Sequence, residues 1–224
     1  MREQYLQQLQ ALHEAMVKMG DKCQMAIELA IQALTNCDKA LIIKEQEIDS
    51  EIDKLEREIE THCLQLLLRQ QPVAGDLRDI SAALKMISDM ERIGDQASDI
   101  AEIAGYLQNQ PAMHKTALEQ MAGEAIKMVQ QSIASFVHRD LELANQVIAY
   151  DDVVDDYFEK IKSEIITLLS QDSTMGAYCM DLLMVAKYLE RIADHATNIA
   201  EWVEYSVTGK RPKDGVIPEG DTFS

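Results

Sequence analysis

Residues 91–102 read ERIGDQASDIAE and residues 190–201 read ERIADHATNIAE, with eight of the twelve positions identical. The two segments are 99 positions apart, counted from 91 to 190. A second pair of similar segments, DSEIDKLEREI from Asp49 and DDVVDDYFEKI from Asp151, lies upstream at an offset of 102. Chance similarity between helical segments rarely produces two such matches in the same order. We therefore interpret the chain as two copies of one unit that differ in the length of a connecting loop.

Residues that break helices are few, and they separate long segments with helical periodicity. The four prolines are Pro72, Pro111, Pro212 and Pro218, and apolar residues recur at helical spacing between them. Aromatic residues make up only 5% of the chain, which favours helices over strands. We expect six helices, over residues 3–36, 39–70, 75–108, 112–138, 141–170 and 176–207.

The connections between the expected helices are short, as at Cys37-Asp38. Short connections force consecutive helices to run antiparallel, so each unit becomes an up-down-up bundle. The sequence thus predicts an all-α fold of two tandem antiparallel three-helix bundles related by internal duplication. We place the first repeat at 1–110 and the second at 111–208. The Gly, Pro and charged residues of 209–224 predict a flexible C-terminal tail.

The composition narrows the function classes. The formal net charge is −18 and the isoelectric point is about 4.6, which argues against binding nucleic acid or docking unassisted on an anionic membrane. An acidic surface suits cations or a basic patch on a partner protein. The four cysteines show no CxxC spacing and the N-terminus has no apolar signal region, so we expect a cytoplasmic protein. No Gly-rich phosphate loop or catalytic Ser/His/Asp set stands out, which argues against an enzyme.

Carboxylates at helical spacing recur in both copies of the repeated motif. Glu91, Asp95 and Asp99 are spaced i, i+4 and i+8, so they lie on one face of their helix. Like charges at this spacing cost a helix about 0.2–0.5 kcal/mol per pair, so helix stability does not explain this ladder. The corresponding residues of the second copy are Glu190, Asp194 and Asn198.

Aspartates of the preceding helix are expected at the same height as each ladder. Two antiparallel helices joined near residue 73 place Asp53 level with residue 93 and Asp49 level with residue 97. The same argument in the second half concerns Asp155 and Asp151, which are expected level with Glu190 and Asp194.

Gathered carboxylate and amide oxygens are hard ligands that suit Fe, Mn, Mg or Ca better than thiolate-bound Zn. We therefore predict a site for such a cation in each half. The alternative interpretation is a solvated acidic face, on which Arg92 and Arg191 pair with Asp95 and Asp194. His195 is a weaker ligand candidate, because its side chain points about 100° away from the ladder.

The segment RQQPVAGDLRDISAALKMISDMERIGDQASDIAE, Arg69 to Glu102, and the later segment YLERIADHATNIAE resemble the PhoU family. Proteins of this family are accessory regulators of the phosphate-specific ABC transporter, and the resemblance covers nearly the whole chain. It implies a six-helix, cytoplasmic, homodimeric protein that restrains the phosphate-starvation response without being an enzyme. The implied partners are the ATPase subunit of the phosphate transporter and a sensor histidine kinase.

The family's E/D-xxx-D motifs are associated with multinuclear metal clusters, and by motif match they fall on the two ladders. Two features depart from the family pattern. Asn198 stands where a carboxylate is expected, which removes a charge from the second ladder. The second copy also has no counterpart of PVAGDLR, so any role of Asp76 and Arg78 belongs to the first half alone.

Two alternative functions remain open from the residues. A ferritin-like di-iron carboxylate bundle would be an enzyme, but that fold requires Glu-x-x-His on two helices. None of the five histidines has Glu three positions before it. An accessory protein of another type of phosphate transporter would share the same helical and acidic character.

Overall fold

The computed structural model describes residues 2–70, 74–107 and 115–210. Six long helices form, as the sequence predicts, and their ends lie within three residues of the expected positions. The helices are α1 (Arg2–Asn36), α2 (Lys39–Gln70), α3 (Ala74–Tyr106), α4 (Lys115–His138), α5 (Leu141–Gln171) and α6 (Gly176–Thr208), with a short 3-10 turn, Ser173–Met175, before α6.

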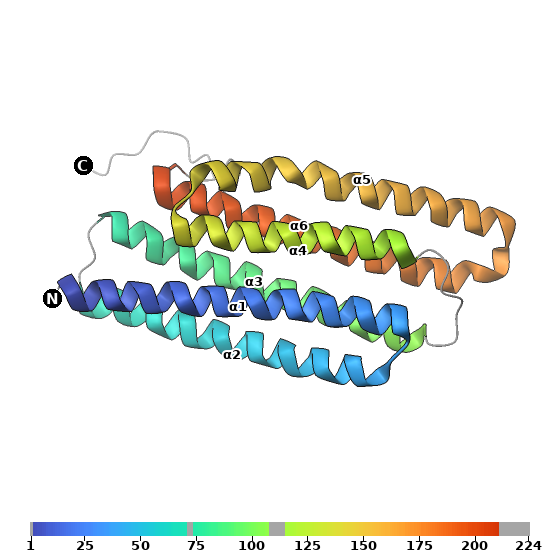
Figure 1. Ribbon diagram of the computed structural model, residues 1–224, viewed down its shortest axis with the longest axis horizontal. Coiled ribbons are helices and arrows are strands. Elements are labelled where there is room, and N and C mark those ends of the chain that lie inside the picture. Colours follow the sequence, from blue (N-terminus) through green and yellow to red (C-terminus); the bar gives the residue numbers. More distant parts are fainter. Residues whose placement is uncertain (1, 71–73, 108–114, 211–224) are drawn as a thin grey trace, which may run out of the picture.

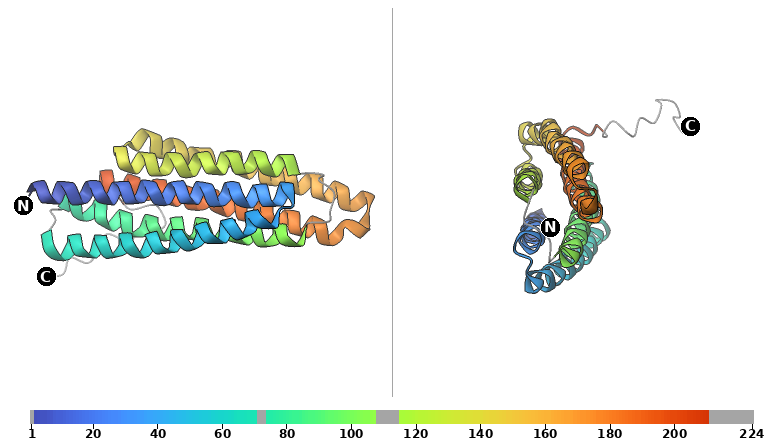
Figure 2. Two further views of the ribbon diagram at one scale, coloured as in Figure 1. Left: turned by 60° about the horizontal axis from the view of Figure 1, so that its bottom comes forward. Right: turned by 90° about the vertical axis from the view of Figure 1, so that its right-hand side faces the viewer.

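The six helices lie side by side and form two three-helix bundles (Figure 1). Helices α1, α2 and α3 pack on one another, and so do α4, α5 and α6. Across the described residues the two bundles meet through α3 with α6 and α1 with α4. Viewed end-on, α1 and α4 occupy the inner side of a curve made by α2, α3, α6 and α5 (Figure 2). The predicted all-α, internally duplicated fold is confirmed.

The turns inside the two bundles have the same construction. Cys37 and Arg139, which are 102 positions apart, have positive φ angles of 55° and 52°. A left-handed residue at the end of a helix lets the chain reverse at once. The aspartate that follows each of them then caps the next helix. Asp38 Oδ1 accepts from the Ala40 amide at 2.9 Å, and Asp140 Oδ1 accepts from the Leu143 amide at 3.0 Å.

These turns also connect the two halves of the molecule. The Arg139 guanidinium forms an ion pair with Asp79 of α3, whose side chain is almost fully buried. The matching turn residue, Cys37, lies beside Tyr178 at the start of α6. Tyr178 is 99 positions after Asp79, so the two contacts are copies of one another. The halves are therefore related by an approximate two-fold rotation.

The core consists mainly of Leu, Ile, Met and Ala side chains along the inner faces of all six helices. Helices α1 and α4 approach closely at Gly20, where an added Cβ would clash with Ile133 Cδ1 and require that side chain to move. In the described ranges, no helix is long and apolar enough to cross a membrane. The expected repeat boundary at 110/111 and residues 211–224 of the expected tail lie outside the described residues.

Candidate functional site

The structure brings the first ladder together with the aspartates of α2. We define the first cluster as Asp49 and Asp53 of α2 with Glu91, Asp95 and Asp99 of α3. Asp49 interacts electrostatically with Asp95, Asp53 and Asp99, and Glu91 interacts with Asp95 and Asp53. The register prediction is thus correct to within a turn of helix.

Gly94 allows α2 and α3 to come this close. A Cβ at this position would lie 3.1 Å from Asp49 Oδ1 and 3.0 Å from Ile52 Cδ1. Both contacts are tighter than ordinary van der Waals separation, so a larger residue would require the Asp49 and Ile52 side chains to shift by a few tenths of an ångström. Glycine at this position therefore leaves room for the Asp49 side chain beside the ladder.

Burial and mutual repulsion disfavour the ionised forms of three carboxylates of the first cluster. Burial, followed by the charges of Asp95, Asp53 and Asp99, raises the pKa of Asp49 to about 6. Burial and neighbouring carboxylates also raise the pKa of Glu91 and of Asp95. Two exposed arginines relieve this charge only in part. The Arg57 guanidinium lies 3.6 Å from Asp53, and Arg92, which is 4.0 Å from Asp89, opposes the rise in the pKa of Glu91 without cancelling it. A bound cation would stabilise the cluster by offsetting the repulsion.

Glu45 extends the first cluster into the core, and the sequence interpretation did not include it. Its side chain is fully buried, and neither carboxylate oxygen has a hydrogen-bond partner within the described residues. Burial and the charge of Asp49 raise the pKa of Glu45 to about 8, while the nearby Ser98 hydroxyl opposes the shift without reaching hydrogen-bonding geometry. The position 102 residues later is Val147, which is buried. Position 45 falls where the helical periodicity of α2 predicts a buried apolar residue. A glutamate at such a position was the sequence signal from which this site residue could have been found.

The second half gathers a smaller acidic group. We define the second cluster as Asp151 and Asp155 of α5 with Glu190 and Asp194 of α6. Asp151 interacts with Asp194, and Asp155 interacts with Glu190, as the register argument predicts. The Thr197 hydroxyl also donates to Asp151 Oδ1 at 3.2 Å.

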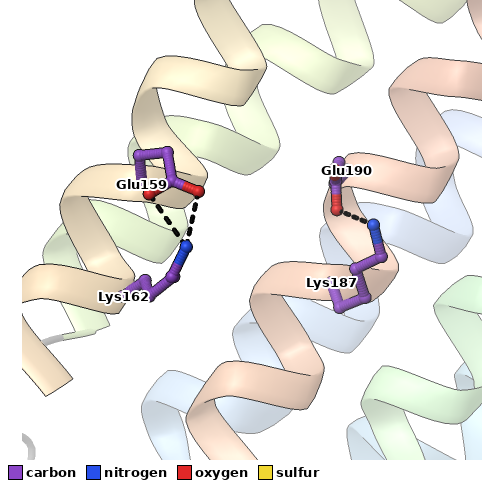
Figure 3. Close-up of polar contacts among 4 residues, drawn as sticks. All are labelled: Glu159, Lys162, Lys187 and Glu190. Atoms are coloured by element: carbon purple, nitrogen blue, oxygen red, sulfur yellow. Dashed lines mark hydrogen bonds and ion pairs between the residues drawn. The ribbon is translucent and has the colours of Figure 1, made fainter. Parts of the chain in front are cut away.

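A lysine already neutralises part of the second cluster. The Lys187 ammonium forms an ion pair with Glu190, and Figure 3 shows the two side chains facing each other along α6. The same ammonium lies 5.5 Å from the ring centroid of Phe158 on α5. Its positive charge opposes the rise in pKa that burial and nearby carboxylates produce at Asp155 and Asp194. Lys187 is a second functional residue that the sequence interpretation missed.

The third position of each ladder faces the other half of the molecule. The Asn198 amide donates to Asp89 Oδ1 of α3 at 3.3 Å, and His195 Nδ1 lies 2.9 Å from the same oxygen. In the mirrored contact, the Tyr188 hydroxyl of α6 donates to Asp99. Asn198 is thus directed towards α3, and both third positions help to hold α3 against α6.

The two clusters differ in how well they fit a metal ion. Throughout the described ranges, no three His, Cys, Asp or Glu side chains converge closely enough to hold an ion as they stand. Binding at either cluster would therefore require the carboxylates to adopt other rotamers. The first cluster fits a hard cation in its chemistry, because it offers five carboxylates and the orphaned Glu45. The second cluster fits less well, because Lys187 already provides a positive charge.

The fold and the two clusters define a class of protein: an internally duplicated helical bundle with carboxylates gathered between the last two helices of each half. A family model described as PhoU domain matches this chain twice, over residues 16–104 and 118–203. The chain belongs to the PhoU family, which confirms the resemblance noted from its motifs.

Relatives of known name are similar over almost their whole length. A phosphate-specific transport system accessory protein PhoU homolog of Synechocystis is 39% identical, over 94% of this chain and 94% of the relative. A protein of the same name from Zymomonas mobilis is 35% identical, over 95% and 92% of the two chains.

Two crystal structures are similar in fold. The structure of PhoU from Pseudomonas aeruginosa gives a TM-score of 0.86 at 33% identity, covering 92% of this chain and 100% of the other. The phosphate transport system regulatory protein PhoU of Streptococcus pneumoniae also gives 0.86, at 25% identity, covering 93% and 99%.

Proposed function

We propose that this protein is a non-enzymatic, cytoplasmic regulator of phosphate uptake and of the phosphate-starvation response. The observation that carries the proposal is membership of the PhoU family over both halves of the chain. The named relatives are accessory proteins of a phosphate-specific transport system, which supports the same role here.

The partners that we propose are the ATPase subunit of a phosphate ABC transporter and a sensor histidine kinase. The net charge of −18 supports docking on basic surfaces of partner proteins, because complementary charge accelerates and orients association. We also propose that the protein acts as a homodimer. Contact with the membrane would then be indirect, through the transporter.

We further propose that the first cluster holds Fe, Mn, Mg or a similar cation. Its carboxylates would supply the oxygen ligands. The raised pKa of Asp49 supports this proposal, because a bound cation would offset the burial and repulsion that disfavour its ionised form. The bound cation would stabilise this face of the protein and present a charged surface to a partner. The corresponding site in the second half remains a prediction, at Asp151, Asp155, Glu190, Asp194 and Asn198.

The partner proposal is tested by affinity capture of the tagged protein from cells grown at high and low phosphate. We expect a phosphate-transporter ATPase or a sensor kinase among the captured proteins, identified by mass spectrometry. A deletion strain should keep phosphate-starvation genes active in phosphate-rich medium. Normal repression in the deletion strain would contradict the regulatory role, and capture of a different phosphate transporter would assign the protein to that system.

The metal proposal is tested by elemental analysis of the purified protein. Changing Glu91, Asp95 and Asp99 to alanine should remove most of the bound metal. The matched control changes three exposed glutamates outside both clusters, which removes the same charge, and should leave the metal content unchanged. The control residues are Glu28, Glu119 and Glu142. Equal metal in the cluster variant and the parent would exclude the first cluster as the site.

A further inference from the structure

The two acidic clusters are built from matched positions but carry different charges. Seven positions correspond through the offsets of 102 and 99. At these positions the first half has six carboxylates, whereas the second half has four carboxylates and one ammonium, so the formal charges are −6 and −3. The pairs are Asp49/Asp151, Asp53/Asp155, Glu56/Phe158, Ser88/Lys187, Glu91/Glu190, Asp95/Asp194 and Asp99/Asn198.

At two of these pairs, the residues of the second half lie close to each other in the structure. Phe158 replaces Glu56 and Lys187 replaces Ser88, and in the structure the Lys187 ammonium lies 5.5 Å from the Phe158 ring centroid. A cation over an aromatic face is attracted by the negative potential of the ring. The ring therefore helps to hold the ammonium on the side of Glu190, between α5 and α6.

The environment of Lys187 shows what the ammonium neutralises. It is paired with Glu190, whose side chain is only 17% exposed, it lies over the Phe158 ring, and it interacts electrostatically with Asp155 and Asp194. Three of the four carboxylates of the second cluster thus respond to this one cation. Ser88, at the matched position of the first half, carries no charge. The first half instead has Arg57, at the position that matches Glu159, and this exposed guanidinium lies 3.6 Å from Asp53 at the edge of the first cluster.

We propose that the Lys187 ammonium is the resident cation of the second cluster, so that this half of the protein neutralises its carboxylates internally and binds a divalent metal ion more weakly than the first half. The proposal rests on the proposed function only in taking the first cluster as the metal site. The duplication would then have produced one half with an exchangeable cation and one half with a covalently tethered cation.

The test uses Mn²⁺, whose free concentration is measured by electron paramagnetic resonance during titration of the full chain. The first cluster is first disabled by Asp49→Asn and Asp95→Asn. In that background, Lys187→Ser copies the first half, and Lys187→Met removes the charge but keeps an apolar stem against Phe158. Each variant should bind Mn²⁺ about tenfold more tightly than the background, which corresponds to roughly 1.4 kcal/mol.

Lys162→Ser is the matched control. Lys162 also lies near Phe158, at 5.9 Å, but it pairs with Glu159, which is outside the second cluster (Figure 3). This variant removes the same charge and should change Mn²⁺ affinity less than twofold. Equal affinities for the Lys187 and Lys162 variants would overturn the proposal.

The outcome is independent of the proposed metal function. If the chain with an intact first cluster binds no Mn²⁺, the metal proposal for that cluster fails, whereas the comparison of Lys187 and Lys162 variants still decides the role of Lys187. Melting temperatures in chelator provide a second measurement of each variant. Lys187→Ser should lower the melting temperature more than Lys162→Ser, and added Mn²⁺ should restore it.

Discussion

The two halves share a backbone plan but handle buried charge in opposite ways. Among the described residues, the first half has a core acid without a hydrogen-bond partner, Glu45, and its cluster meets the cations of Arg57 and Arg92 at exposed positions. The second half has Val147 in place of that acid and Lys187 within its cluster. Four carboxylates occupy matched positions in both halves, while Glu56/Phe158, Ser88/Lys187 and Asp99/Asn198 differ in charge. Duplication therefore preserved the scaffold and allowed the electrostatics of each copy to change separately.

The largest expected effect concerns the core acid. Glu45 has a pKa of about 8 in the folded protein and an ordinary value near 4.5 when exposed. As pH rises from 4.5 to 8, the unfolded chain loses this proton while the folded chain retains it, so stability decreases across that interval. Glu45→Gln should remove roughly 4 kcal/mol of the difference in unfolding free energy between pH 5 and pH 9.

This experiment is performed by denaturant unfolding at both pH values, with chelator present. Glu47→Gln, an exposed glutamate of the same helix, is the control and should leave the pH dependence unchanged. Val147→Glu should create the same pH dependence in the second half. Parallel pH profiles for Glu45→Gln and the parent would show that this carboxyl is ionised in the folded protein.

The next largest effect concerns the two matching turns. Removing Arg139 leaves Asp79 buried without its ion-pair partner, so Arg139→Ala should lower the free energy of unfolding by about 2–3 kcal/mol at pH 7. The loss should be smaller at pH 4, because burial raises the pKa of Asp79 and acid conditions favour its neutral form. Adding Asp79→Asn to Arg139→Ala should recover part of the loss. A loss below 0.5 kcal/mol, on the order of a surface ion pair, would show that Asp79 is solvated.

The turn of the first half should respond in the opposite direction. Cys37 adopts a left-handed backbone conformation, with a φ angle of 55°. Cys37→Gly should raise the free energy of unfolding by about 0.5–1 kcal/mol, because glycine adopts positive φ without steric cost. Arg139→Gly should instead be destabilising, since the same backbone gain is offset by the lost ion pair. Chemical denaturation of the two glycine variants gives the comparison directly.

The smallest effect concerns the ladders without metal. In chelator, Asp95→Asn should leave stability equal or raise it by about 0.2–0.5 kcal/mol, because it removes repulsion within the first cluster. Asp194→Asn should be neutral or slightly destabilising, because Lys187 attracts Asp194. Thermal melts with and without added cation should show a larger cation-induced shift for the parent than for Asp95→Asn. Destabilisation by Asp95→Asn of more than about 1 kcal/mol in chelator would identify a structural carboxylate.

Helix bounds and register were predictable because they depend on local features. Uninterrupted periodicity and short connections were enough to orient consecutive helices. Counting back from the connections before α3 and α6 then brought Asp49 and Asp155 level with their ladders. Asp49, expected level with residue 97, interacts with Asp95 and Asp99 on either side of that level, and Gly94 provides the space beside it.

Features that depend on three helices at once were not predictable in the same way. The periodic pattern marks position 45 as core, but it does not show that the core accepts an unpaired acid there. Lys187 and Glu190 are visibly three residues apart, whereas the Phe158 ring that completes their environment comes from another helix. The contacts of Asn198 and His195 with Asp89 join opposite halves, and consecutive-helix register says nothing about that packing.

The mirrored contacts between α3 and α6 have a consequence for how such a protein could arise. In a symmetric dimer of identical three-helix chains, residue i of one chain meets residue j of the other, and j meets i. A dimer of the first half alone would place Asp89 against Asp99 twice, and these are like charges. In the fused chain, Asn198 faces Asp89 and Tyr188 faces Asp99, so each carboxylate meets a hydrogen-bond donor. In a covalently fused chain, the two symmetry-related contacts can change independently, because a substitution in one half no longer appears in the other half.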